Sequence, residues 1–473
     1  MRGIMKKLLT IPIFTLLFLS LVSTASAEWE ITQLTNNSEY EGPPQNNDNG
    51  HIVWIGMGGG ADVEIFFFDG SITVQLTDNS GYDDEVFNPQ LNNEGQVVWN
   101  DFSHIYYYDG ISTKSFLVGI IDLIEHSHRI NNSGHTVWSV GNEIYYYDGS
   151  AVTQLSDGYS NWYPEINDNG HVVWSLGFRS YGIDYYFVFY HDGISARALG
   201  PTSTVAPVPK INNSGHVVWS ADGGSDGGTD REIFYYNGTS IIQLTTNNTF
   251  DSSPDINDNG KITWRGYDGT DYEIFYYDGN TIIQLTNNSK NDGIPQINNS
   301  GHIVWSSPYG GGDTDSEIFY YDGSAITQLT DNTHSDAGPN INDNGQIVWQ
   351  GDDGTDFEIF MAENNDFDSD EVENDLDNCP NTCNPSQLDA DSDGTGDACD
   401  ATPNCGGCGQ PACEVSCDID NDGIFNAEDN CPDSCNTQQL DADGDNIGDV
   451  CDETPDCGGN SCGVSQPACE SGC

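Results

Sequence analysis

Four Asp-rich segments near the C-terminus place side-chain oxygens at one repeating spacing. Counted from the first Asp of each segment, the oxygens fall at positions 1, 3, 5, 9 and 12. This is the ligand spacing of a calcium loop, in which position 7 adds a carbonyl oxygen and position 12 closes the coordination shell. Ca²⁺ prefers oxygen ligands, and clustered carboxylates would repel one another without a cation. The segments therefore predict calcium binding.

The four segments span Asp366–Asp377, Asp389–Asp400, Asp418–Asp429 and Asp441–Asp452. Their candidate calcium ligands, with the carbonyl donors of position 7 included, are Asp366, Asp368, Asp370, Val372, Asn374, Asp377, Asp389, Asp391, Asp393, Thr395, Asp397, Asp400, Asp418, Asp420, Asp422, Ile424, Asn426, Asp429, Asp441, Asp443, Asp445, Ile447, Asp449 and Asp452.

Position 6 of each segment needs a residue that tolerates a turn. It is Gly394, Gly423 and Asn446 in three segments, and the first segment departs from the pattern with Glu371. Position 12 is Asp rather than Glu, and no amphipathic helices flank the segments, so the pattern is not that of an EF-hand. A disordered acidic tail that happens to repeat is the alternative interpretation.

The same segments resemble thrombospondin type 3 repeats. The resemblance lies in Asp-Asn-Cys-Pro, at Asp377–Pro380 and Asp429–Pro432, and in the Cys spacing from Cys379 to Cys399. It implies calcium wrapped by an irregular chain that disulfides tie together, in a family associated with extracellular matrix and adhesion.

All 14 cysteines lie between Cys379 and Cys473, in two copies of seven. An exported protein would form disulfides there. Because each copy holds an odd number, at least one bridge joins the copies or two thiols remain free. The pairing stays open, and zinc is the alternative for Cys405 and Cys408.

The region before this tail is repetitive and aromatic. A unit with one Trp occurs eight times, and Asn-Asp-Asn-Gly or Asn-Asn-Ser-Gly precedes most of these Trp residues. Each unit offers four short strands, namely one before the turn, one ending in Trp, one ending in Asp-Gly and one ending in Gln-Leu-Thr. Segments such as Ile-Phe-Tyr-Tyr are apolar on both faces, as in sheets sandwiched between neighbouring sheets.

We therefore predict an all-β protein with an eight-bladed β-propeller, followed by an irregular C-terminal domain stabilised by disulfides and calcium. Seven blades are the nearest alternative, and a linear β-solenoid is the competing array. The last unit ends at Phe357–Asn364 without a Gln-Leu-Thr strand, whereas an orphan strand of that kind opens the chain at Ile31–Thr35. This N-terminal strand would close the ring and remove both sheet edges.

Residues 31–362 resemble the propeller repeats of the periplasmic translocation protein TolB and its relatives. The shared pattern is Gln-Leu-Thr, Asp-x-Gly and aromatic-Asp-Gly, although the Ser-Pro-Asp-Gly turn usual in that family is Asn-Asp-Asn-Gly here. The resemblance implies a propeller that binds proteins, peptides or glycans, or that accompanies a hydrolase domain.

The N-terminus and the charge indicate an exported protein. Residues 1–27 combine basic residues, an apolar run and an Ala-Ser-Ala ending, which is typical of a signal peptide rather than a membrane span. We expect the propeller in residues 28–363 and the calcium-binding region in residues 364–473. The 75 Asp and Glu against 12 Lys and Arg give a net charge of −63, which excludes a nucleic-acid partner. The expected location is secreted, extracellular or cell-surface, with the periplasm as an alternative.

No catalytic signature such as HExxH or GxSxG occurs in the chain. The second to fourth units depart most from the repeat, and we expect a ligand-binding face there that involves Arg129, Arg179, Tyr181, His126 and His128. The sequence therefore predicts a secreted, calcium-binding, non-enzymatic protein for binding or adhesion, with a protein or glycan ligand on the propeller. The alternatives are an extracellular glycan-active hydrolase or lyase with carboxylates at the central mouth of the propeller, and a structural cell-surface component.

Overall fold

The computed structural model describes residues 22–24, 29–58, 62–78, 86–101, 103–117, 127–181, 183–222, 230–308, 315–364, 378–379, 386–390 and 394–399. The chain divides into two compact units, Met1–Asn364 and Asn365–Cys473. None of the described residues forms a helix, and no described segment could cross a membrane as one.

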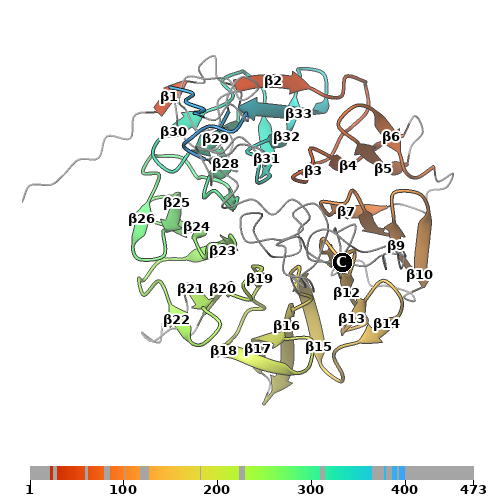
Figure 1. Ribbon diagram of the computed structural model, residues 1–473. Coiled ribbons are helices and arrows are strands. Elements are labelled where there is room, and N and C mark those ends of the chain that lie inside the picture. Colours follow the sequence, from red (N-terminus) through yellow and green to blue (C-terminus); the bar gives the residue numbers. More distant parts are fainter. Residues whose placement is uncertain are drawn as a thin grey trace, which may run out of the picture. The chain divides into compact units, whose positions relative to one another are not determined.

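The first unit is a β-propeller of eight sheets arranged around a central axis (Figure 1). Each of the first four blades, from the inner to the outer strand, contains four antiparallel strands. They are β3 (Gln45–Asn46), β4 (Ile52–Met57), β5 (Val63–Phe68) and β6 (Thr73–Gln75); β7 (Phe87–Leu91), β8 (Val97–Asn100), β9 (His104–Tyr108) and β10 (Thr113–Leu117); β11 (His128–Ile130), β12 (Thr136–Val140), β13 (Glu143–Tyr147) and β14 (Val152–Gln154); and β15 (Ser160–Ile166), β16 (Val172–Ser180), β17 (Ile183–His191) and β18 (Ala196–Ser203).

Blades 5 to 8 repeat this order. They are β19 (Lys210–Ile211), β20 (Val217–Ala221), β21 (Glu232–Tyr236) and β22 (Ile241–Gln243); β23 (Asp251–Ile256), β24 (Ile262–Tyr267), β25 (Tyr272–Tyr277) and β26 (Ile282–Gln284); β27 (Gln296–Ile297), β28 (Ile303–Ser307), β29 (Glu317–Tyr321) and β30 (Ile326–Gln328); and β31 (Asp336–Ile341), β32 (Ile347–Asp352), β33 (Phe357–Asn364) and β2 (Trp29–Gln33). The prediction of an all-β, eight-bladed propeller is confirmed.

The ring closes where the sequence predicts. Strand β2 from the N-terminal end of the propeller pairs antiparallel with β33 from its C-terminal end, in a register that places Trp29 opposite Asn364 and Gln33 opposite Phe360. The eighth blade is thus assembled from both ends of the propeller sequence, which leaves neither end as a free edge.

Strand β1 (Val22–Thr24) pairs in parallel with β30 at the outer edge of blade 7. It lies within the predicted signal peptide, residues 1–27, and the remaining residues of that segment lie outside the described part of the chain. The signal peptide stays a prediction.

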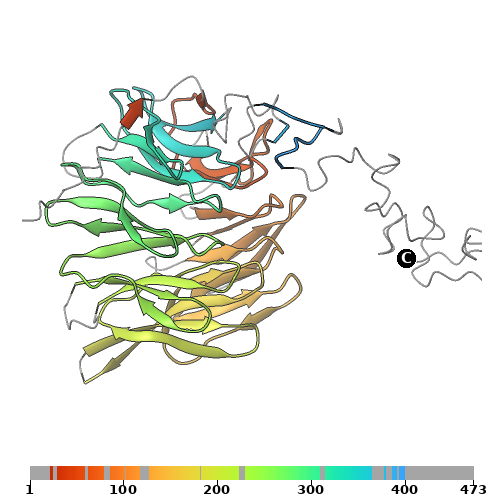
Figure 2. The ribbon, with the colours of Figure 1, turned by 60° about the vertical axis from the view of Figure 1, so that its left-hand side comes forward.

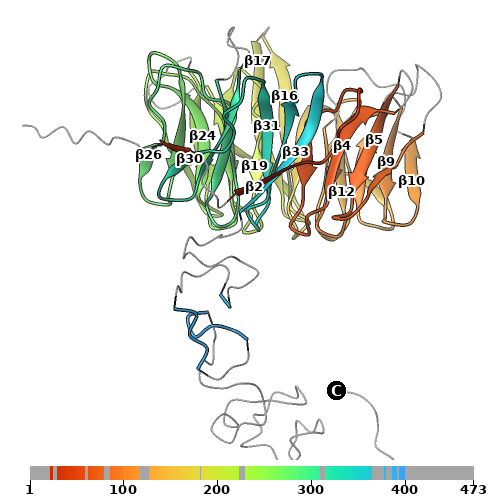
Figure 3. The same ribbon diagram turned by 90° about the horizontal axis from the view of Figure 1, so that it is seen from above.

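The hydrophobic core lies within and between the blades. Each blade buries one Trp, with at most 2% of its surface exposed, against an aromatic residue of the next strand, as in the stacked pair of Trp264 and Phe275. Residues of adjacent blades form common clusters, such as Val218 and Ile233 of blade 5 with Ile262 of blade 6. Seen from the side, the sheets stand face to face (Figure 2 and Figure 3). This explains why the strands are apolar on both faces.

A ring of asparagine side chains joins the inner strands. The first Asn of each inner turn donates a hydrogen bond from Nδ2 to the backbone carbonyl of the equivalent Asn in the next blade, over 2.7–3.0 Å. The eight members are Asn47, Asn92, Asn131, Asn167, Asn212, Asn257, Asn298 and Asn342, and the last donates to the first. The sequence predicts the turns, and the structure adds that they fix each blade to its neighbour.

Candidate functional site

The inner strands also place one side chain per blade two residues before the ring asparagine. These eight residues are Gln45, Gln90, Arg129, Glu165, Lys210, Asp255, Gln296 and Asn340. Four consecutive blades, 3 to 6, carry charged residues of alternating sign at this position, and the other four carry amides. One side chain from the same position of each repeat therefore contributes to a ring around the axis. Half of this ring is charged and the other half carries amides.

All of these residues except Glu165 line one cavity of about 500 Å³ on the inner side of the blades. Its wall also includes Arg231, Ser220 and Ser253. Three of the nine basic residues that follow residue 27 thus gather at one cavity in a chain of net charge −63. Such a concentration of cations favours an anionic ligand.

Glu165 pairs with two of these cations. It is 8% exposed, and its carboxylate accepts hydrogen bonds from Arg129 Nε at 3.0 Å and from Lys210 Nζ at 3.1 Å. Burial would raise the pKa of Glu165, but the positive charges of Arg129 and Lys210 outweigh that effect and hold its pKa below the usual value. Glu165 therefore remains ionised and orients both cations.

Among the described residues, Asp255 is the one carboxylate on the cavity wall itself. Its Oδ2 accepts a hydrogen bond from the backbone N–H of Ile297 at 3.2 Å. Burial raises the pKa of Asp255 above its usual value, against the opposing charge of Lys210 and with a further upward contribution from Glu165. A carboxylate with a raised pKa beside fixed cations is suited to proton transfer.

The structure separates the residues of the predicted binding face. Arg129 lines the central cavity, whereas Arg179 lines a different cavity of about 620 Å³ beside the turn of blade 4 and pairs with Asp184 at 3.7 Å. Tyr181 is fully exposed in that turn, and His128 is buried in β11 with 1% of its surface exposed. His126 lies outside the described residues.

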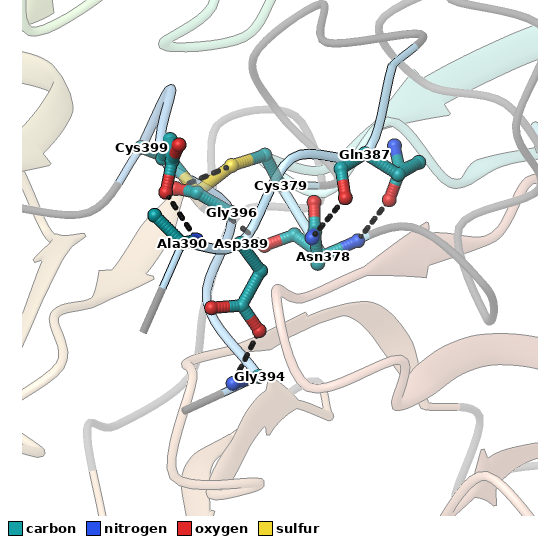
Figure 4. The surroundings of a disulfide bond; sticks show 9 residues. Asn378, Cys379, Gln387, Asp389, Ala390, Gly394, Gly396 and Cys399 are labelled. Carbon is teal, nitrogen blue, oxygen red and sulfur yellow. Dashed lines mark hydrogen bonds between the residues drawn. A yellow bond between two sulfur atoms is a disulfide. The ribbon is translucent and has the colours of Figure 1, made fainter. Parts of the chain in front are cut away.

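Part of the second calcium segment is described. Asp389 Oδ2 accepts a hydrogen bond from Gly394 N at 3.0 Å, and Asp397 Oδ1 accepts one from Ala390 N at 2.7 Å (Figure 4). Gly394 has a positive φ of 97°, as position 6 of the segment requires. A disulfide joins Cys379 to Cys399. These contacts form a tight turn that includes two of the predicted ligands.

Most of the other predicted calcium ligands lie outside the described part of the chain. Besides Asp389 and Asp397, the structure describes Thr395, the predicted carbonyl donor of the same segment. The geometry of the remaining positions in the four segments therefore stays a prediction.

Sequence reasoning missed Glu165, Lys210 and Asp255. The signal is present in the printed sequence, because each stands two residues before a turn asparagine, where other units have Gln or Asn. Aligning the units on that asparagine would have exposed the charged half of the ring.

Comparison with known proteins identifies the tail by sequence. Residues 362–387 and 411–439 match the Thrombospondin type 3 repeat family. These ranges contain the first and third Asp-rich segments. No curated protein sequence matches the chain.

Solved structures resemble the propeller. The β-propeller domain of the Trilobed protease from Pyrococcus furiosus is 11% identical, with a TM-score of 0.44, and the match covers 62% of this chain and 99% of that one. Oligogalacturonate lyase from Vibrio parahaemolyticus is 11% identical, with a TM-score of 0.47 and coverage of 73% and 96%. Pyrococcus horikoshii acylaminoacyl peptidase is 12% identical, with a TM-score of 0.42 and coverage of 66% and 57%. At these identities the likeness is one of fold.

These matches contradict the prediction of a non-enzymatic protein for binding or adhesion. The matched structures belong to a protease, a lyase and a peptidase. The sequence prediction relied on the lack of a linear catalytic motif, and a propeller instead assembles its central residues from separate blades. The resemblance to TolB in particular is not confirmed, whereas the propeller is.

Proposed function

We propose that the chain is an extracellular enzyme that cleaves an acidic glycan at the central cavity of the propeller. The observation that carries this proposal is the gathering of Arg129, Lys210, Arg231 and Asp255 on one cavity wall. The cations suit a sugar that bears a carboxylate.

The arrangement favours a lyase over a hydrolase. Hydrolysis of a glycoside usually needs two carboxyl groups that face the bond to be cleaved. Here Asp255 faces the cavity, whereas Glu165 is buried behind Arg129 and Lys210 and is occupied by both. One carboxylate with several cations suits removal of a proton next to a sugar carboxylate.

In the proposed reaction, Arg129 and Arg231 pair with the carboxylate of the sugar and stabilise the charge that develops when the neighbouring C–H bond breaks. Asp255 accepts that proton. A C=C bond forms as the adjacent C–O bond to the leaving sugar breaks, and Lys210 donates a proton to the leaving oxygen. Proton exchange with solvent then restores Asp255 and Lys210, so no further reactant is required.

The experiment is a screen of the full chain on polysaccharides that contain uronic acids, with neutral polysaccharides as the substrate control. A lyase releases unsaturated ends that absorb ultraviolet light together with new reducing ends, whereas a hydrolase releases reducing ends alone. Activity in wild type and Asn340→Ala that is lost in Asp255→Asn supports the proposal. Equal activity in wild type and Asp255→Asn contradicts it.

The tail supports a second, independent function, which is calcium binding outside the cell. The family match at residues 362–387 and 411–439 and the turn between Asp389 and Asp397 support it. Removal of calcium with EDTA should reduce the protease resistance of the tail and change its circular dichroism. Unchanged signals would exclude a calcium-dependent fold there.

A further inference from the structure

Blades 6 and 8 share a short acidic motif outside the central cavity. The segments Asp268–Glu273 and Asp353–Glu358 both read Asp-Gly-Thr-Asp-aromatic-Glu and link the second strand of the blade to the third. In both, the first Asp accepts hydrogen bonds from the Thr two residues later, through its N–H and its Oγ1. The two blades therefore build the same turn.

Each turn brings three carboxylates together. One oxygen each from Asp268, Asp271 and Glu273 lies within 4.8 Å of the others, and Asp353, Asp356 and Glu358 of blade 8 do the same. Ligands on opposite sides of a Ca²⁺ ion at 2.3–2.6 Å lie about 4.6–5.2 Å apart. Each cluster thus has the dimensions of a calcium coordination sphere.

Buried oxygens in both clusters lack a partner. Asp271 is only 6% exposed, and neither of its carboxylate oxygens has a hydrogen-bond partner in the described structure. Glu358 is fully buried, and its Oε2 likewise has no partner, although Oε1 accepts a hydrogen bond from Asn37 N at 2.7 Å. A buried carboxylate oxygen without a partner is costly, so a bound cation at these atoms would be strongly stabilising.

Among the described residues, no Lys, Arg or His forms an ion pair with either cluster. The basic residue of blade 6 nearest in register, Arg265, is opposite Ile274 and lies 3.9 Å from the ring centroid of Tyr272. Since side chains alternate along a strand, Tyr272 and Arg265 lie on the opposite face of the sheet from Asp271 and Glu273.

We propose that each of these clusters binds one Ca²⁺ ion, so that the propeller has calcium sites of its own. The carboxylates of Asp268, Asp271 and Glu273 are the protein ligands in blade 6, and those of Asp353, Asp356 and Glu358 are the ligands in blade 8. Each ion neutralises the buried charge and fixes the turn between the second and third strands of its blade. These sites are independent of both the tail and the proposed enzymatic reaction.

Terbium luminescence in the full chain tests these sites. All ten Trp and all 23 Tyr precede residue 365, so excitation through Trp or Tyr favours emission from Tb³⁺ bound close to aromatic residues of the propeller, and loss of emission in the site variants assigns it to the two clusters. The wild type should show this emission, and Ca²⁺ should compete it away. Asp271→Asn with Glu273→Gln should lose about one bound ion, and Asp356→Asn with Glu358→Gln should lose another, because each pair removes two of the three carboxylates that a site needs.

The matched control is Glu143→Gln. Glu143 occupies the position of Glu273 in blade 3, but Gly141 stands where Asp271 would be. This variant should keep the emission of the wild type. Absence of sensitised emission in the wild type, or full emission in both double variants, would overturn the proposal.

Thermal unfolding followed by Trp fluorescence provides a second readout. In EDTA the blade 6 variant should melt at or above the wild type, since it has lost a buried charge. In Ca²⁺ the wild type should gain more stability than the variant, and equal gains would contradict the proposal. If the double variant fails to fold, Asp271→Asn alone serves, because that side chain has no hydrogen bond to lose.

Discussion

The two halves of the central ring have the same backbone and different chemistry. Blades 3 to 6 present Arg129, Glu165, Lys210 and Asp255, whereas blades 7, 8, 1 and 2 present amides at the same position. Within the amide half, Asn340 Nδ2 donates a hydrogen bond to Gln296 Oε1 at 2.5 Å. All eight asparagines of the ring remain bonded across both halves.

A repeat can thus change its chemistry at one position while the asparagine bonds that close the propeller ring stay the same. One position per unit varies in charge, and another, two residues later, carries an asparagine bond between blades that is the same in all eight units. The proposed function therefore rests on the position that varies between the two halves, whereas the asparagine bonds between blades are the same in both. Variants of the charged half and of the amide half should therefore differ in activity, whereas variants of the asparagine ring should not differ between the halves.

Asp255→Asn should lower kcat/KM by roughly 10²- to 10⁴-fold, the usual contribution of a general base, because the amide cannot accept the proton. The control is Gln90→Ala at the same ring position in the amide half, which should stay within a few-fold of the wild type. Initial rates on the substrate found in the screen measure both. A loss in Gln90→Ala as large as that in Asp255→Asn would show that the halves do not differ in function.

Glu165→Gln should lower the free energy of unfolding by about 2 kcal/mol, since two cations lose their partner. This is less than the 3–5 kcal/mol of a fully buried pair because Arg129 and Lys210 are 30% and 35% exposed. Urea unfolding at neutral pH measures the loss, and Gln45→Ala should cost less than about 1 kcal/mol.

The same effect has a predictable pH dependence. The folded pKa of Glu165 is depressed, so its contribution to stability is present above the unfolded pKa of about 4.3 and is lost as the pH falls through the lower folded value. The difference between wild type and Glu165→Gln should therefore shrink below about pH 4. A constant difference would show that the cations do not stabilise the ionised form.

Asn257→Ala and Asn47→Ala should each cost about 1–3 kcal/mol, since each leaves buried backbone groups unpaired. Asn257 donates to Asn298 O at 2.9 Å, and Asn47 donates to Asn92 O at 2.7 Å. Denaturant unfolding should give similar losses for the two variants, although one lies in the charged half and the other in the amide half. Unequal losses would show that the charged residues contribute to closure.

The acid limb of the pH profile should show the smallest effect. Asp255 must be ionised to act as a base, and burial raises its pKa. The rise of kcat/KM with pH should therefore be centred above about 3.9, the value of an unperturbed Asp. Asn340→Ala should leave the midpoint unchanged, and a midpoint at or below that of free Asp would contradict the role of Asp255 as the base.

The fold followed from the sequence because the repeat is written in residues with strict local requirements. The eight Trp, the Asn-Gly turns and the orphan strand at Ile31–Thr35 were sufficient to predict eight blades and their closure. The candidate site was harder to predict from the sequence. Arg129 was selected because its unit is irregular, whereas Glu165 and Asp255 belong to regular-looking strands and are separated by 90 positions in the chain.

The sequence by itself determined the architecture of the propeller, its closure and the match of the tail to thrombospondin type 3 repeats, because strand period, turn residues and Asp spacing are local properties. Only the tertiary structure brought one residue from each blade to a common cavity and left Asp271 buried without a partner. Charge and burial depend on neighbours from distant parts of the chain, so local patterns could not show which carboxylates are paired with a cation and which are buried without a partner.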